Sequence, residues 1–237
     1  MLTRFKTLVL ASALATLSVT SAFAGGEYGT WNDGGSYSGG ASGSGANIMN
    51  GQITLQTQWS NINTVIDSVG GDAALQGAAA GNLVDIMTMN DTRVNSSQYV
   101  GPDAAIGSNI IADVSNVWGS VGMSNQAICN GASVSTDPIV TAVRSSQECR
   151  ASDPSSLIDA RVNGVVGDMA VQSLAMGNTL ETDSNAPNFP VFNNQINGSI
   201  GASTINMSAF NIGGSMSLTS GAIGNKAQIL HYSTNGH

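Results

Sequence analysis

Hydrophobic and polar residues return to the same positions in this chain at intervals of 48 residues. The clearest stretch is residues 62–82, INTVIDSVGGDAALQGAAAGN, and three later stretches repeat it, with one residue fewer between the third and fourth copies. A fixed period of roughly 20–50 residues is typical of solenoids, propellers and other arrays. The repeating columns include Ile62/Ile110/Ile158/Ile205, Gly71/Gly119/Gly167/Gly214, Leu75/Met123/Val171/Leu218 and Ala79/Ala127/Ala175/Ala222.

Apolar residues within each copy alternate with polar ones, as in the pair Val84 and Ile86, and this predicts strands buried on one face. We interpret the Gly-Asn pairs as turns between strands, because Gly and Asn tolerate a positive φ. About four strands of five to seven residues fit in one copy. This leaves open either two coils per copy in a β-solenoid, hence eight coils, or one blade per copy in a four-bladed propeller. Columns of Gly, Ala and Ser favour the narrow solenoid, so we expect an all-β β-solenoid built from four 48-residue repeats.

One polar column has a mechanism of its own. In an in-register stack, an Asn side chain bonds to the backbone and also to its counterparts above and below, which predicts an amide ladder. The alternative is four independent surface turns that merely favour Asn. The column consists of Asn82, Asn130, Asn178 and Asn225.

The N-terminal segment has the pattern of a secretory signal peptide. Arg4 and Lys6 precede a short apolar run, and Ala22-Phe23-Ala24 ends it, so we expect cleavage after residue 24. Residues 25–51 are rich in Gly and Ser, and we expect a disordered arm there. The aromatic residues within it leave open a contact with a partner or a polymer. The repeats then occupy residues 52–230, and residues 231–237 form a tail.

Charge limits the classes of partner. Charged residues make up 9% of the chain, against about 25% in ordinary globular proteins. Removing residues 1–24, with Arg4 and Lys6, leaves five basic residues against 15 acidic ones, a net charge of −10. So few basic residues argue against nucleic-acid binding. No later segment is apolar for long enough to span a membrane as a helix. We therefore expect a secreted protein that crosses the periplasm, resides at the cell surface and does not insert into a membrane.

The two cysteines of the exported chain, Cys129 and Cys149, are expected to pair. Cys129 stands where the other copies have Gly, and the intervening sequence contains Pro138. We therefore expect residues 131–150 to be an excursion from the solenoid, closed by the disulfide. Such a bond would contribute about 3 kcal/mol to stability.

Motifs for a nucleophile, a phosphate loop or a metal site do not occur, so we expect no enzymatic activity, no cofactor and no metal. The alternative is a carbohydrate-binding or carbohydrate-active β-helix that uses aspartates together with an exposed Trp59 or Trp118. Glycosidases use paired carboxylates, whereas scattered aspartates are typical of turns. The candidate carboxylates are Asp67, Asp113, Asp159 and Asp168.

Two resemblances centre on the Gly-Asn pair. The segment AIGNKAQI, residues 222–229, resembles the core of curlin repeats. The wider pattern, with strands rich in Ser, Ala and Asn that end in Ala-x-Gly-Asn, covers residues 52–230. It is similar to the holdfast-attachment (holdfast anchor) surface proteins of stalked alphaproteobacteria. That resemblance implies a cell-surface protein that anchors or assembles an adhesive, polysaccharide-containing layer, and it transfers no catalytic residues.

The two open ends of a solenoid carry unpaired backbone groups, which are templates for another chain. The sequence places no membrane barrel or lipid site after the repeats, so a surface role would require partners. We expect association with itself or with companion surface anchor proteins, and a polysaccharide remains a further candidate partner. The expected assembly edges are Gln52 and Ile53 at one end and Gln228 and Ile229 at the other.

Overall fold

The computed structural model of the chain describes residues 46–89, 91–136, 141–185 and 189–232. These residues form twelve β-strands, and none of them lies in a helix. The strands are β1 (Ala46–Thr54), β2 (Gln58–Val69), β3 (Ala73–Thr88), β4 (Thr92–Val100), β5 (Ala105–Val117), β6 (Val121–Thr136), β7 (Thr141–Cys149), β8 (Ser152–Val165), β9 (Met169–Ser184), β10 (Val191–Asn197), β11 (Ala202–Ile212) and β12 (Met216–His231).

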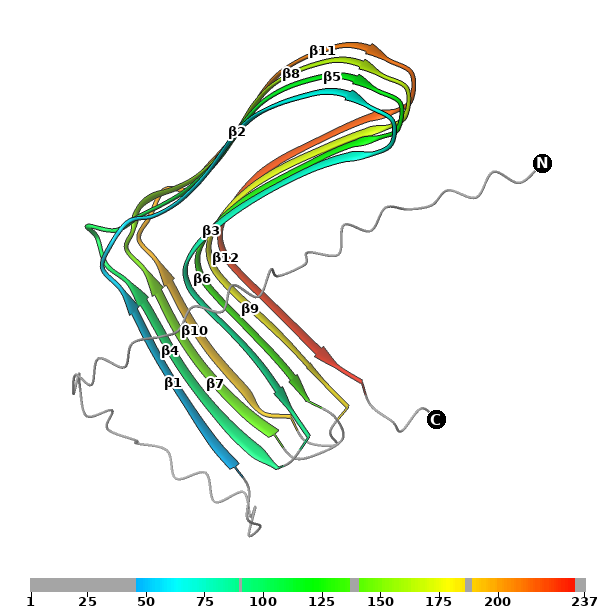
Figure 1. Ribbon diagram of the computed structural model, residues 1–237. Coiled ribbons are helices and arrows are strands. Elements are labelled where there is room, and N and C mark those ends of the chain that lie inside the picture. The colour runs from blue at the N-terminus through cyan, green and yellow to red at the C-terminus, as the bar shows by residue number, and fades with distance from the viewer. Residues whose placement is uncertain (1–45, 90, 137–140, 186–188, 233–237) are drawn as a thin grey trace. The chain divides into compact units, whose positions relative to one another are not determined.

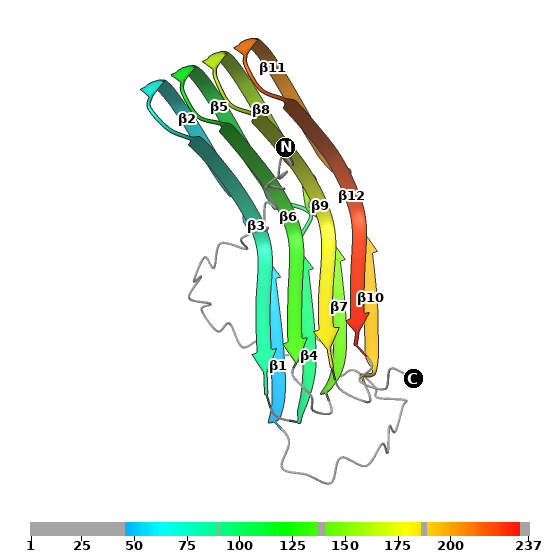
Figure 2. The same ribbon diagram turned by 90° about the vertical axis from the view of Figure 1, so that its right-hand side faces the viewer.

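The strands form three parallel sheets of four strands each (Figures 1 and 2). Sheet A has the order β1-β4-β7-β10, sheet B the order β2-β5-β8-β11, and sheet C the order β3-β6-β9-β12. Each sequence repeat supplies one strand to each sheet, so each repeat is one coil, which we call a rung and number 1 to 4 along the chain. All strand pairs join neighbouring rungs. The chain is therefore the expected all-β solenoid of four repeats.

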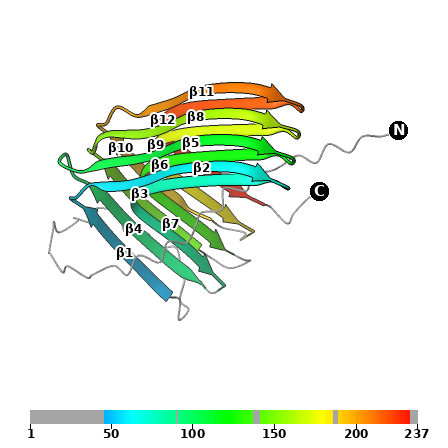
Figure 3. The same cartoon turned by 45° about the horizontal axis from the view of Figure 1, so that its top comes forward.

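The prediction of two coils per repeat was wrong, and the structure has four rungs in place of eight coils. The propeller alternative is excluded because strands of successive repeats pair in parallel, one above the other (Figure 3). The error came from strand length, since each strand of sheet C has 16 residues where five to seven were expected. Four rungs span about 14 Å, because neighbouring strands lie 4.7–4.9 Å apart.

The Gly-Asn pair is not a turn. β3 continues through Gly81 and Asn82, and the other sheet C strands continue through the same pair of positions. At this point the alternation of inward residues slips by one position. Ala79 is buried before it, whereas Asn82 and Ile86 are buried after it. The slip lets one long strand cover sheet B with its first half and sheet A with its second half, and sheet C bends between the two (Figure 1).

A positive φ occurs instead at the tip of each rung, where sheet B turns into sheet C. One residue per rung adopts it, at positions 48, 48 and 47 apart. The adjoining glycines stack closely, since the Gly119 amide donates to the Gly71 carbonyl at 3.1 Å and the Gly167 amide to that of Gly119 at 2.9 Å. A Cβ at Gly119 would lie 2.5 Å from the backbone of Gly71, so only glycine fits there. The positive-φ residues are Ser68, Asn116, Gly164 and Asn211.

The core consists mainly of inward columns from rungs 2 and 3, with a few buried residues of rung 1 and partly buried equivalents in rungs 1 and 4. Its largest part lies between sheet B and the first half of sheet C, around Ile110, Ile158 and Met123. A second cluster of small residues lies where the three sheets meet. A third lies between sheet A and the second half of sheet C, around Val94 and Val134. Burial is thus complete only for rungs that have a neighbour on both sides.

The described residues of the segment 131–150 do not form the expected excursion. Residues 131–136 complete β6, and β7 occupies Thr141–Cys149 with β4 on one side and β10 on the other. The expected arm also ends earlier than predicted, because β1 begins at Ala46. The predicted signal peptide at 1–24, residues 25–45 of the arm and tail residues 233–237 lie outside the described part of the chain.

We expect Ile110→Ala to lower the free energy of unfolding by about 2–5 kcal/mol, because Ile110 is fully buried between sheets B and C. The matched control is Ile111→Ala, whose side chain points outward from the same strand and is 41% exposed. It should cost less than about 1 kcal/mol. Urea unfolding followed by circular dichroism measures both, and equal losses would contradict this placement of the core.

Candidate functional site

The Asn column forms a hydrogen-bonded ladder through all four rungs, as the sequence predicted. The Nδ2 group of Asn82 donates to Oδ1 of Asn130 at 2.8 Å, Asn130 donates to Asn178 at 2.8 Å, and Asn178 donates to Asn225 at 2.8 Å. The middle two side chains are fully buried. Every step of this ladder has its donor in the lower-numbered rung, so the ladder has a direction.

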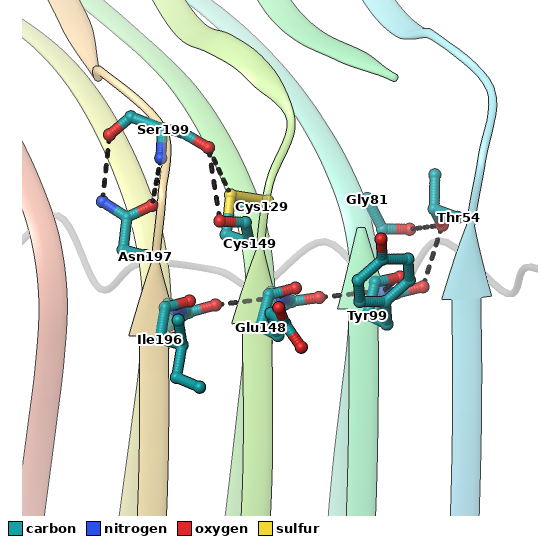
Figure 4. Close-up of a disulfide and its surroundings, with 12 residues drawn as sticks. Thr54, Gly81, Tyr99, Cys129, Glu148, Cys149, Ile196, Asn197 and Ser199 are labelled. Carbon is teal, nitrogen blue, oxygen red and sulfur yellow. Dashed lines mark hydrogen bonds between the residues drawn. A yellow bond between two sulfur atoms is a disulfide. The ribbon is translucent and has the colours of Figure 1, made fainter. Parts of the chain in front are cut away.

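A second hydrogen bond fixes the orientation of each amide. The Nδ2 groups of Asn82, Asn130 and Asn178 also donate to backbone carbonyls of sheet A in the next rung, at 2.8–3.0 Å. The acceptors are Tyr99, Glu148 and Ile196, whose carbonyl groups stand in a row in Figure 4. A carbonyl oxygen can accept from the amide nitrogen but not from the amide oxygen, so an inverted amide would lose both bonds. The Asn column therefore ties sheet C of one rung to sheet A of the next.

A second ladder, which the sequence analysis missed, runs through sheet A beside the first. Gln98 donates to Gln52 at 2.8 Å, Gln147 donates to Gln98 at 2.8 Å, and Gln195 donates to Gln147 at 2.7 Å. Each Nε2 also donates to a sheet C carbonyl of its own rung, at 2.8–3.0 Å. Here every donor lies in the higher-numbered rung, so this Gln ladder points opposite to the Asn ladder. Its spacings are 46, 49 and 48, which a search at a constant period does not find.

A third polar layer joins sheets B and C. The Asn125 amide donates to the Leu157 carbonyl at 2.9 Å and to the Ser108 carbonyl. In rung 3 the same layer is a contact between the hydroxyls of Ser156 and Ser173 at 2.8 Å. Buried polar groups are costly unless they are bonded. These layers are therefore stable only while the rungs keep their register.

The predicted disulfide between Cys129 and Cys149 is present, with the two Cα atoms 5.9 Å apart (Figure 4). It connects β6 of rung 2 to β7 of rung 3, next to the Asn ladder. One rung earlier, the equivalent positions hold Gly81 and Val100, and a Cβ on Gly81 would lie 2.7 Å from Val100. The disulfide thus fills the corner where a glycine faces a branched side chain in the preceding rung.

The four candidate carboxylates are exposed, and three of them lie on strands of sheet B. Asp67 accepts from Ser115 at 2.7 Å and Asn116 at 2.9 Å, and these bonds lower its pKa. Asp159 and Asp168 accept from the next rung in the same way. Asp113 pairs in register with Arg161. Three of the four carboxylates therefore bond to residues of the adjacent rung.

The two candidate tryptophans differ in setting. Trp59 lies flat over Gly107, where a Cβ would overlap its ring. Trp118 is 72% exposed at the rung tips and borders a shallow groove. The groove is lined by residues of three successive rungs, Asn116, Val117, Trp118, Gly164, Val165, Val166, Asn211, Ile212 and Gly213.

The four predicted edge residues lie on terminal strands but in different sheets. Gln52 and Ile53 belong to β1 at the edge of sheet A, and Gln228 and Ile229 belong to β12 at the edge of sheet C. The two pairs would therefore not face each other across a stacked interface, where β1 is opposite β10 and β3 is opposite β12.

Among the described residues, no group of three or more His, Cys, Asp or Glu side chains is arranged to hold a metal ion. The same residues include no helix long and apolar enough to cross a membrane. Comparison of the chain with family models, with curated proteins and with solved structures finds no match.

We expect Asn178→Leu to cost about 3 kcal/mol, because it removes three hydrogen bonds of a buried amide, each contributing about 1 kcal/mol. Asn61→Leu, at an exposed position on the outer face of β2, is the control. Thermal and urea unfolding of both variants measure the difference. Equal and negligible shifts would show that the ladder contributes nothing to stability.

We expect the native protein to contain no titratable thiol, and its reduction to lower stability by about 3 kcal/mol. The informative variant is the double substitution Cys129→Gly with Cys149→Val, which restores the pair found one rung earlier. It should fold with the same circular dichroism spectrum and lose about the same stability. If this double variant does not fold, the disulfide is a requirement for the fold and more than a stabilising link.

Proposed function

We propose that the chain is an exported structural protein of the cell surface that anchors or assembles an extracellular adhesive layer. The observation that supports this most directly is the continuous bonding along the stack. Each rung is joined to the next by three parallel strand pairs and two amide ladders, and rungs 2 and 3 also by a disulfide. A load that separates two rungs must break these bonds together, which suits a load-bearing element.

The chemistry of the outer faces agrees with a scaffold role. The long outer faces of the sheets hold many uncharged polar residues, among them Asn61, Asn63, Ser97, Ser146 and Gln172. Such groups exchange hydrogen bonds with a hydroxyl-rich polymer without requiring charge. The likeness of the repeat pattern to holdfast-attachment proteins points in the same direction.

A carbohydrate-binding role is the second candidate, and the groove beside Trp118 is the observation that favours it. The ring of Trp118 offers an apolar face to solvent, and Asn116 and Asn211 supply polar groups at the same groove. A carbohydrate-active role would in addition need two carboxylates about 5–9.5 Å apart across the scissile bond. Asp67, Asp159 and Asp168 already accept hydrogen bonds from the next rung, so binding at the groove beside Trp118 is favoured over hydrolysis.

The test is deletion of the gene in its own organism, with immunolabelling of intact cells. We expect the label on the cell surface, and we expect cells without the chain to release adhesive polysaccharide into the medium. Complementation with the wild-type chain should restore retention, and Trp118→Ala should restore it equally if the chain acts as a scaffold. Failure of Trp118→Ala alone, with Trp59→Ala active, would favour the carbohydrate-binding role. Unchanged polysaccharide retention in the deletion strain would contradict the proposed function.

A further inference from the structure

The large exposed hydrophobic side chains of the described residues lie mainly on rungs 1 and 4, and several are members of the core columns. Met216 is 52% exposed, whereas its in-register equivalents Met169 and Val121 are 1% and 2% exposed. Leu218 is 48% exposed, whereas Val171 is 2% exposed. These residues are exposed only because no further rung covers them. The rung 4 end of the stack therefore exposes side chains that belong to the hydrophobic core columns.

We propose that this end is covered by a second copy of the chain, stacked head-to-tail, with rung 4 of one copy on rung 1 of the next. Strands β10, β11 and β12 would then pair in parallel with β1, β2 and β3 of the next copy, in the register that joins the rungs within one chain. The inference names the partner of the proposed scaffold and to that extent rests on the proposed function.

In this stack the Asn ladder continues across the contact between two copies. Within the chain each Asn donates to the Asn of the next rung and to a sheet A carbonyl of that rung. Asn225 has no next rung, and its amide turns to the Gln195 carbonyl of its own rung at 3.3 Å. In the stack Asn225 donates to Asn82 of the next copy and to the carbonyl of Ile53, which is the equivalent of Tyr99.

The Gln ladder continues with the opposite direction. Each Gln within the chain donates to the Gln of the preceding rung, and Gln52 has no preceding rung. In the stack Gln52 of the next copy donates to Oε1 of Gln195. One end of the stack thus offers an Asn donor and a Gln acceptor, and the other end offers an Asn acceptor and a Gln donor. Two identical ends in contact could not continue either ladder, because two Asn donors or two Asn acceptors would meet.

Charge selects the same orientation. The described residues of rung 1 include Asp67, Asp72 and Asp85 and no Lys or Arg, whereas those of rung 4 include Lys226 and no acidic residue. Lys226 forms an ion pair with Glu181 of rung 3 at 2.8 Å. Asp85 lies in the same column as Glu181, so stacking places an acidic group on the other side of Lys226 too. Contact between two rung 1 ends would instead place six carboxylates and no Lys or Arg of the described residues in one interface.

A head-to-tail contact between identical subunits does not close on itself unless it rotates into a ring, so the expected product is an open filament. Each subunit would add four rungs, or about 19 Å of filament length. Electron microscopy of the purified full exported chain should show such filaments, and their fibre diffraction should include the strand spacing of about 4.8 Å.

Engineered cysteines test the orientation. Ser208 and Val65 occupy the same outward column of sheet B in rungs 4 and 1. The double variant Ser208→Cys with Val65→Cys should form intermolecular disulfides under mild oxidation, seen as a ladder of multimers on non-reducing gels. Ser208→Cys with Asn61→Cys, four residues out of register, should give little cross-linking. Dimers formed by either single variant alone would show contact between like ends and overturn the proposal.

A substitution at the rung 4 end tests the contact between copies directly. Leu218→Lys should lower the assembled fraction by about tenfold or more, because it would bury an unpaired ammonium group between copies. Ile111→Lys, at a 41% exposed position of rung 2, is the matched control and should assemble as wild type does. Circular dichroism of both variants checks the fold. Sedimentation that finds wild-type chain only as a monomer at its highest soluble concentration overturns the inference, as does normal assembly of Leu218→Lys.

The two proposals fail separately. If the purified chain forms cross-linked filaments but polysaccharide retention on cells is unchanged by deletion, stacking stands and the surface role is wrong. If deletion releases the polysaccharide while Leu218→Lys complements fully and the pure chain stays monomeric, the surface role stands and the stacking partner is wrong.

Discussion

The structure depends on one constraint, which is that every residue must lie directly above its equivalent in the preceding rung. Parallel pairing at offsets of 46–49 residues enforces it for the backbone in all three sheets. A slip by one residue would turn each inward column outward. It would also separate the amides of both ladders from their acceptors. The repeat period is therefore a structural requirement that the sequence must meet at every rung.

The polar interior makes this constraint strict. An interior of aliphatic side chains tolerates small shifts, because apolar contacts have little directional preference. Amide ladders do not, since each bond requires a donor and an acceptor at a fixed separation. Gln98, Gln147, Asn130 and Asn178 are almost fully buried, and each is stable there only because its neighbours above and below hold equivalent groups. Low aromatic content and a narrow core agree with this division of roles, in which amides set the register and aliphatic side chains supply burial.

Much of this arrangement was predictable from the sequence, because a constant period is visible without coordinates. The period indicated the solenoid, the register of sheets B and C, and the ladder of Asn82, Asn130, Asn178 and Asn225. The cysteine pair followed from the expectation of export, under which two cysteines pair. The solenoid and the ladder rest on residues that recur every 47 or 48 positions. The disulfide rests on a residue type of which the chain has only two members.

Some features were not predicted because the local sequence is compatible with more than one structure, or because a column lacks a constant period or residue type. A Gly-Asn pair is typical of turns, yet here Gly81 is required by close contact with Val100 and Asn82 by the ladder. The strand therefore continues, and the number of coils was overestimated twofold. The Gln ladder was missed because the connections between rungs vary in length, so its members fall outside a constant period. The tip turns were missed because Ser68, Asn116, Gly164 and Asn211 share a φ angle but not a residue type.

The opposite directions of the two ladders give the stack a property that neither has alone. Hydrogen-bonded amides in a row polarise one another, and a single ladder would sum its dipoles along the stack. Beside the Asn ladder, which donates toward rung 4, the Gln ladder donates toward rung 1. The two dipoles oppose each other, so adding rungs does not accumulate a dipole along the stack, whereas each end still carries one donor and one acceptor in fixed positions. Growth by stacking would therefore not be penalised by a rising dipole, and the two ends would remain distinguishable at any length. A column of identical side chains can in this way extend a structure and specify its polarity at the same time.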